Sequence, residues 1–196
     1  AAWAGWLENL GYTVPEPTAL LYTQKSDQIE YEKGGSVPAP LALPREHNDT
    51  RFMVDSAIDY IGQQQDNWLV HLSLLRPHPP WIAPKPYNAM YTPEKLQNFE
   101  RQPDIETEAK QHPLLNHYLH LPYHFVTNDD KKTARLKASY FGLMTEVDDN
   151  LGRLFEFLKK TGQWNDTLII FTSDHGEQMG DHWLLGKMGY FDASYQ

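Results

Sequence analysis

An acidic and an imidazole side chain stand side by side where an apolar run ends in LIIFTSDHGEQMGDHWLLGK, residues 168–187. Asp174 offers a hard anionic oxygen, and His175 offers a nitrogen of intermediate softness. The pair suits Mn²⁺, Zn²⁺ or another divalent ion, and suits Ca²⁺ less well because Ca²⁺ prefers oxygen ligands alone. Gly176 would let the backbone turn sharply and approach the ion or a substrate closely. The dipeptide alone is also compatible with a capping aspartate and a surface histidine.

A lysine follows twelve residues after this pair, in HWLLGK. Lys187 could neutralise the charge that develops on a substrate oxyanion, which is a common use of a lysine in an active site. Most lysines, however, are simply solvated. Asp181 and His182, which lie between, either support the pair or belong to a polar loop.

A third candidate side chain, His78, stands just past the end of another apolar run, residues 67–77. This run and residues 167–172 are typical of buried strands. In open α/β sheets, ligands gather beyond the carboxyl ends of the strands. If the two strands are parallel, His78 converges with Asp174 and His175 on one edge of the sheet.

The elements that must position these side chains follow an α/β order. The clearest helix is predicted at residues 131–162, where Gly162 would follow the last turn. Its apolar side chains step by three or four residues: Leu136, Tyr140, Leu143, Val147, Leu151, Leu154 and Leu158. Shorter helices are predicted at residues 1–10 and after the start signal at 48–50. Strand, loop, long helix and strand in this order favour a largely parallel sheet with helices on its faces.

The bulk composition limits the classes of protein. A chain of 196 residues with 40% hydrophobic and 22% charged residues is long enough for one domain, in which residues 12–45 form an irregular connection. The net charge of −9 without a basic tract argues against a nucleic-acid partner. No apolar stretch reaches the roughly 18 residues that span a bilayer, so we expect no membrane partner. We expect a soluble protein and favour the cytoplasm, although no residue defines the compartment.

Two stretches of the sequence, which together hold four motifs in the right order and spacing, resemble those of one enzyme family. LSLLRPHPPWIAPKPYNAMY and SDHGEQMGDHWLLGKMGYFDASYQ, separated by ASYFGLMTEVDDNLGRLFEFLKKTGQWNDTLIIFTSDHG, are similar to motifs of the sulfatase branch of the alkaline phosphatase superfamily. The similarity is strongest to phosphonate monoester hydrolases and arylsulfatase-like enzymes, and it covers residues 50–196. It implies a large mixed, mostly parallel sheet flanked by helices, as in alkaline phosphatase.

The resemblance also implies a reaction: metal-dependent hydrolysis of small anionic esters, namely phosphonate, phosphate or sulfate monoesters. Asp174 and His175 would be metal ligands, His78 would hold a substrate oxygen or protonate the leaving group, and Lys187 would neutralise the transferring group. The Asp-His pair favours the phosphonate hydrolase group and Mn²⁺, with Ca²⁺ or Zn²⁺ as alternatives. An arylsulfatase or choline-sulfatase-like enzyme is the alternative function, and assembly into a homo-oligomer is left open.

The chain departs from the family pattern in what it lacks. The family takes two further metal-binding carboxylates from an earlier strand, and its formylglycine nucleophile arises from a cysteine in a Cys-x-Pro/Ala-x-Arg motif. This sequence has no cysteine, begins AAWAGW without a methionine, and ends FDASYQ. We therefore expect residues 1–196 to be one partial catalytic domain from the interior of a larger enzyme, with no nucleophile of its own. By itself it would be an inactive fragment or a binding module.

Overall fold

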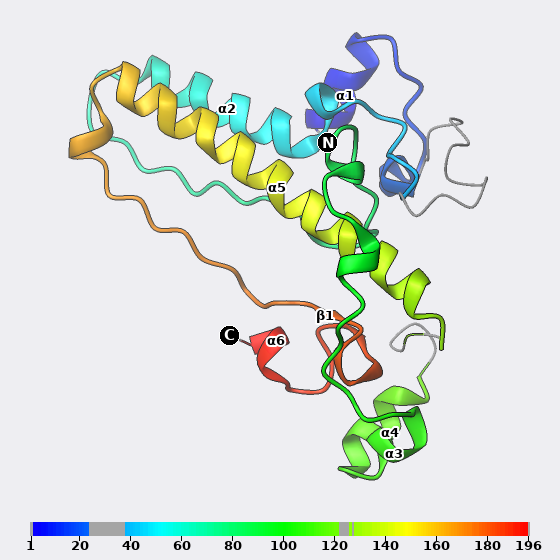
Figure 1. Ribbon diagram of the computed structural model, residues 1–196. Coiled ribbons are helices and arrows are strands. Elements are labelled where there is room, and N and C mark those ends of the chain that lie inside the picture. The colour runs from blue at the N-terminus through cyan, green and yellow to red at the C-terminus, as the bar shows by residue number, and fades with distance from the viewer. Residues whose placement is uncertain (1, 24–37, 122–125, 127, 196) are drawn as a thin grey trace. The chain divides into compact units, whose positions relative to one another are not determined.

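The computed structural model describes residues 2–23, 38–121, 126 and 128–195 (Figure 1). The chain forms two compact units. Unit 1 consists of Ala1–Tyr91 and Ser139–Leu168, and unit 2 of Thr92–Ala138 and Ile169–Gln196. The predicted irregular connection at 12–45 lies partly outside the described residues. Its described parts hold only a 3-10 helix, η1 at Thr18–Thr23, and the start of η2 at Arg45–His47.

Unit 1 is built around three α-helices. They are α1 at Ala2–Asn9, α2 at Asp49–Gln63, and the C-terminal part of α5, which spans Asp130–Lys160. Two short 3-10 helices complete the unit: η3 at Tyr87–Ala89 and η5 at Trp164–Asp166. All three predicted helices are therefore confirmed. Gly162 has a φ of +74°, which identifies it as the left-handed residue that ends α5.

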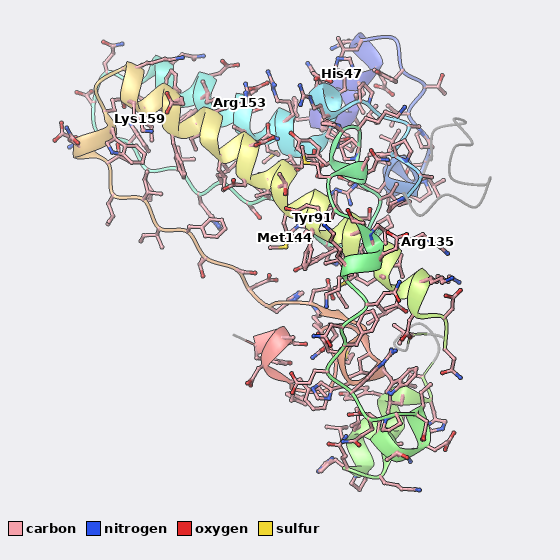
Figure 2. The ribbon with its side chains drawn as sticks, in the orientation of Figure 1. His47, Tyr91, Arg135, Met144, Arg153 and Lys159 are labelled. Atoms are coloured by element: carbon pink, nitrogen blue, oxygen red, sulfur yellow. The ribbon has the colours of Figure 1, made fainter. Side chains whose placement is uncertain are left out.

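Helices α2 and α5 lie side by side and run in the same direction (Figure 1). Asn48, immediately before α2, donates from Nδ2 to Glu146 Oε1 at 2.8 Å. One heptad further along both helices, Asp55 pairs with Arg153, which is labelled in Figure 2. Because these contacts are seven residues apart on each helix, they follow one helix face and hold α2 against α5.

One hydrophobic core cluster of unit 1 lies at the N-terminal end of α2. Its buried members are Trp3, Leu7, Leu21, Leu41 and Leu43. His47, labelled in Figure 2, ties α1 to this end because its carbonyl accepts a 2.9 Å hydrogen bond from Trp3 Nε1. Its ring nitrogen Nδ1 also lies 2.7 Å from the Tyr12 hydroxyl. The start of α2, with Asn48 and Asp49, is therefore a fixed point in unit 1.

Gly142 lets α5 come close to the backbone at the start of η3. A Cβ at this position would lie 2.4 Å from the Tyr87 carbonyl oxygen, closer than any real contact. We expect Gly142→Ala to lower the free energy of unfolding by about 2 kcal/mol, because overpacking outweighs the gain in helix propensity. Gly152→Ala is the control on the same helix, since its Cβ would meet no atom within 4 Å. It should raise stability by about 1 kcal/mol in urea unfolding, and equal effects of the two substitutions would contradict the packing argument.

Unit 2 combines short helices with a small hairpin. The helical elements are η4 at Pro93–Lys95, α3 at Ile105–Ala109, α4 at Pro113–Leu119, the start of α5, η6 at Asp181–Trp183 and α6 at Asp192–Tyr195. Strands β1 (Gln178–Met179) and β2 (Leu185–Gly186) pair antiparallel. The unit has its own core of Ala109, Leu115, Leu119, Val126, Trp183 and Leu184.

The predicted buried strands at 67–77 and 167–172 are not seen in this chain. Neither segment, described throughout, forms a strand, and several of their apolar side chains are exposed: Leu69 is 91% exposed and Phe171 76%. A strand exists only through pairing with a neighbour, and a parallel sheet is buried only when both of its faces are covered. The prediction of burial is therefore wrong for this chain, and the large parallel sheet is not confirmed.

Among the described residues, no helix is both long enough and apolar enough to cross a membrane. Helix α5 has the length, but it carries acidic and basic side chains toward both of its ends.

Candidate functional site

The hairpin in unit 2 brings Lys187 next to His175. Gln178 pairs with Gly186, so the residues that flank this pair at the open end of the hairpin lie opposite each other. Lys187 follows directly after β2, and its Nζ lies 3.3 Å from His175 Nε2. Three of the four predicted site residues, Asp174, His175 and Lys187, are therefore gathered at one end of a two-stranded ladder.

The hydrogen bonds of His175 fix which ring nitrogen carries the proton. Nδ1 lies 2.7 Å from the Gly176 carbonyl oxygen, and a carbonyl can only accept, so Nδ1 is the donor. Nε2 is therefore the nitrogen with the free lone pair in the neutral ring, and it faces Asp174 and Lys187. A histidine whose other nitrogen donates to a carbonyl is oriented as metal-binding histidines are.

Asp174 and His175 present their ligand atoms on the same side. Asp174 Oδ2 lies 3.6 Å from His175 Nε2, and the carboxylate side chain is 88% exposed. Two atoms that each bind one ion at about 2.1 Å lie about 3.0–3.5 Å apart, so this pair fits one divalent ion with a small adjustment. Within the described residues, no group of three or more histidine, aspartate or glutamate side chains is placed to hold a metal. The pair would thus be part of a ligand set.

Gly176 fixes the backbone directly after this pair. Its N–H donates to the Ser194 carbonyl at 2.8 Å, and a Cβ on Gly176 would lie 2.2 Å from the Ala193 carbonyl oxygen. The observed close approach at this glycine is to the chain around α6, and the expected approach to an ion or a substrate stays a prediction. The Ser173 hydroxyl donates to the His175 carbonyl at 2.6 Å. The backbone on both sides of the imidazole is therefore held in place.

The loop between the strands is anchored to the chain before α3. Asp181 Oδ1 accepts from the Glu100 N–H at 2.8 Å, and the His182 N–H donates back to the Glu100 carbonyl at 2.7 Å. Trp183 Nε1 donates to the Gln102 carbonyl at 2.9 Å, and the Arg101 guanidinium lies 3.7 Å from the Trp183 ring centroid. The loop that leads to Lys187 is thus anchored through Asp181 and His182 to the backbone of Glu100.

A buried carboxylate completes this anchor, and sequence reasoning missed it. Glu108 on α3 is 0% exposed, and its Oε1 lies 3.0 Å from His182 Nδ1. The His182 ring also stacks on the Phe191 ring, with 3.6 Å between the ring centroids. Glu108 stands 74 residues before His182 in an ordinary polar helix, so no local pattern could have indicated the contact.

His78 belongs to unit 1. It lies in an exposed turn after residue 75, closed by a 3.0 Å hydrogen bond from its N–H to the Leu75 carbonyl. Nδ1 lies 2.7 Å from the Pro79 carbonyl oxygen, so this nitrogen also carries the proton and Nε2 is directed elsewhere. The expected convergence of His78 with Asp174 and His175 stays a prediction.

Comparison with known proteins identifies the family. The sequence model of the Sulfatase family matches residues 7–195, which is nearly the whole chain. The chain therefore belongs to the sulfatase family.

Individual relatives narrow the similarity. The chain is 40% identical to the multifunctional alkaline phosphatase superfamily protein PehA of Trinickia caryophylli, over 98% of this chain and 39% of the relative. It is 29% identical to the arylsulfatase of Clostridium perfringens, over 74% of this chain and 30% of the relative. The crystal structure of the phosphonate monoester hydrolase of Agrobacterium radiobacter matches with a TM-score of 0.83 and 36% identity, over 99% of this chain and 40% of that one. The chain thus spans about two fifths of the length of PehA and of the phosphonate monoester hydrolase.

Proposed function

We propose that this chain is part of the catalytic domain of a metal-dependent hydrolase that cleaves phosphonate or phosphate monoesters. The observation that carries the proposal is the arrangement of His175, whose Nε2 faces the Asp174 carboxylate and the Lys187 ammonium. Its support is the similarity to a phosphonate monoester hydrolase over 99% of this chain. The Asp-His pair is the ligand pair that the resemblance associates with this group of enzymes.

Asp174 and His175 would hold the ion through Oδ2 and Nε2. A mixed oxygen and nitrogen set favours Mn²⁺, with Ca²⁺ or Zn²⁺ as alternatives. When bound, a divalent ion supplies Lewis-acid stabilisation to an ester oxygen. The further carboxylate ligands and the formylglycine nucleophile would come from residues outside this chain.

Lys187 and His78 would act on the substrate itself. The ammonium of Lys187 is exposed and next to a metal ligand, where it can neutralise charge on the non-bridging oxygens of the transferring group. When the His78 ring is protonated, its Nδ1–H still donates to the Pro79 carbonyl and Nε2–H is left for a leaving-group oxygen. His78 would therefore serve as the general acid or as a donor to a substrate oxygen.

We also propose that residues 67–75 and 168–172 are strands of the larger sheet in the full-length protein. Exposed apolar side chains such as Leu69 and Phe171 need a covered sheet to bury them. Parallel strands at these positions would deliver His78 and the Asp174 cluster to the same edge.

Parallel assays of the full-length protein on an aryl phosphonate monoester and an aryl sulfate test the proposal. We expect kcat/KM to be at least about tenfold higher for the phosphonate, since the geometry of charge in the transition state decides such selectivity. A preference for aryl or choline sulfate would favour the second candidate, a sulfatase, which the arylsulfatase relative supports. Turnover of neither class would refute both. Residues 1–196 alone should show no turnover, and activity of this chain by itself would contradict the assignment of ligands and nucleophile to other residues.

A further inference from the structure

The turn that carries His78 is held by a buried arginine. The Arg76 side chain is 0% exposed, and its Nη1 donates to two carbonyls of the turn, that of His78 at 3.3 Å and that of Pro80 at 3.0 Å. Charge-assisted hydrogen bonds of this kind are about twice as strong as neutral ones. One guanidinium thus holds the backbone of the turn at two points, the carbonyls of His78 and Pro80.

The composition of the turn explains why it needs an outside donor. Residues 77, 79 and 80 are prolines, which have no N–H, so the turn cannot stabilise its own carbonyls in the ordinary way. The backbone N–H of His78 reaches Leu75, and that of Ile82 reaches Pro80. The guanidinium supplies what the prolines lack, and a flexible lysine ammonium would not reproduce the fixed, planar directions of its N–H groups.

Arg76 is in turn fixed by the start of α2. Asp49 Oδ1 lies 3.9 Å from Arg76 Nε and balances its charge in an environment where an unpaired charge would be costly. The guanidinium also lies 4.4 Å from the Tyr22 ring centroid, and the Tyr22 hydroxyl donates to Asp49 Oδ2 at 3.1 Å. Since Asn48 binds α5 through Glu146, the frame behind Arg76 is a packed pair of helices.

We propose that Arg76 is the positioning residue for His78, with Asp49 as its counter-charge, and that this pair sets the His78 imidazole for its work on the leaving group. The inference rests on the proposed function, because it assumes that His78 acts on the departing oxygen. Arg76 itself contacts the backbone of the turn, the Tyr22 ring and the Asp49 carboxylate, all within its own unit.

The test uses the full-length enzyme and a series of aryl esters, of whichever class it hydrolyses, with leaving phenols from unsubstituted phenol to 4-nitrophenol. Arg76→Lys should lower kcat/KM about 10- to 100-fold for the phenyl ester and less than about threefold for the 4-nitrophenyl ester. A poor leaving group needs the proton from His78, and a misplacement of about 1 Å costs on the order of 10²-fold. Arg51→Lys, a matched change at an arginine that pairs with Asp55 on α2, should leave the series unchanged.

A double substitution separates the two hypotheses. If Arg76 acts through His78, Arg76→Lys should add less than about twofold to the loss already caused by His78→Ala. If His78→Ala slows all esters equally, the proposed role of His78 fails, and the role of Arg76 fails with it. If His78→Ala acts on poor leaving groups but Arg76→Lys slows all esters alike, or adds its full effect, the positioning role alone is overturned.

Asp49→Asn keeps the test decisive if Arg76→Lys does not fold. It retains the guanidinium and an acceptor for Tyr22 but removes the counter-charge. We expect the same dependence on leaving group, about 3- to 10-fold for the phenyl ester, with unchanged metal content by elemental analysis. An equal loss for all esters, or no loss, would overturn the proposal.

Discussion

Replacing His175 by alanine in the full-length protein is expected to remove the bound metal and to lower kcat more than 100-fold. The reason is that Nε2 is the only nitrogen in the predicted ligand set and is held toward Asp174 by the bond from Nδ1 to the Gly176 carbonyl. Loss of an outer-sphere partner already costs about 10- to 100-fold in metal affinity or activity, so loss of a ligand should cost more. Elemental analysis of the purified protein, together with the rate on an aryl phosphonate monoester, measures both effects.

Two variants make this result specific. His120→Ala removes another exposed imidazole of unit 2, whose Nδ1 lies 2.7 Å from the Asn116 carbonyl oxygen at the end of α4. It should change neither metal content nor rate. Lys187→Met should lower the rate but keep the metal, because an ammonium cannot be a ligand and acts on the substrate. Full metal content in the His175→Ala protein would rule out the ligand assignment.

The helices could be predicted from the sequence because each one buries a face within this chain. The seven apolar positions from Leu136 to Leu158 recur at helical spacing, and Leu143 and Leu158 are indeed buried. Helix α5 begins one residue earlier and ends two residues earlier than the predicted range of 131–162. A helix satisfies its own backbone hydrogen bonds, so its existence depends little on distant segments.

The strands could not be settled in the same way. The apolar runs at 67–77 and 167–172 have the composition of sheet strands, but a strand needs a partner for every second N–H and carbonyl. Sequence alone does not show whether the partner lies within a chain. The two-residue strands β1 and β2, in contrast, are too short to give any alternation that could be read from the sequence.

In the candidate site, too, some features could be predicted from the sequence and others could not. Asp174, His175 and Lys187 were identifiable from their types and from the motif around them, but the hairpin that joins His175 to Lys187 was not. The role of Arg76 could not be predicted from the sequence either. It stands between a leucine and a proline, and its counter-charge, Asp49, lies 27 residues upstream. Buried polar partners leave no periodic signal because each contact joins distant segments.

Glu146, which lies close to Asn48, Asp49 and Arg76, is expected to make the stability of the protein depend on pH. Its side chain is 0% exposed on α5, and burial raises the pKa of its carboxyl from 4.5 to about 7. The nearby charge of Asp49 raises this pKa further, while the hydrogen bond from Asn48 and the charge of Arg76 act in the opposite direction. Desolvation therefore dominates, and the carboxyl keeps its proton in the folded protein at pH values where it would ionise in the unfolded chain.

This shift fixes the direction of the pH dependence. Below about pH 4.5 the Glu146 carboxyl is protonated in both states and its burial carries no charge penalty. Between pH 4.5 and 7 the folded protein binds the proton more tightly than the unfolded chain, so the free energy of unfolding falls as pH rises. Above pH 7 the deficit is constant at about 3 kcal/mol, because the pKa lies near 7 in the folded protein and near 4.5 in the unfolded chain.

We therefore expect Glu146→Gln to be about 2–3 kcal/mol more stable, relative to the parent protein, at pH 8.5 than at pH 5. Glutamine keeps an acceptor for Asn48 and can never carry the buried charge. Urea unfolding of both proteins at the two pH values measures the difference, and other titrating groups cancel in it. Glu156→Gln is the matched control on the same helix, because the hydrogen bond from Lys159 lowers the pKa of the exposed Glu156 carboxyl below 4.5. This carboxyl is therefore ionised in the folded and the unfolded chain at both pH values, and the stability difference for Glu156→Gln should not change between them. A pH-independent difference for Glu146→Gln would mean that solvent or a charge outside these residues reaches the carboxylate, and the helix pair behind Arg76 would then be less dry than its packing indicates.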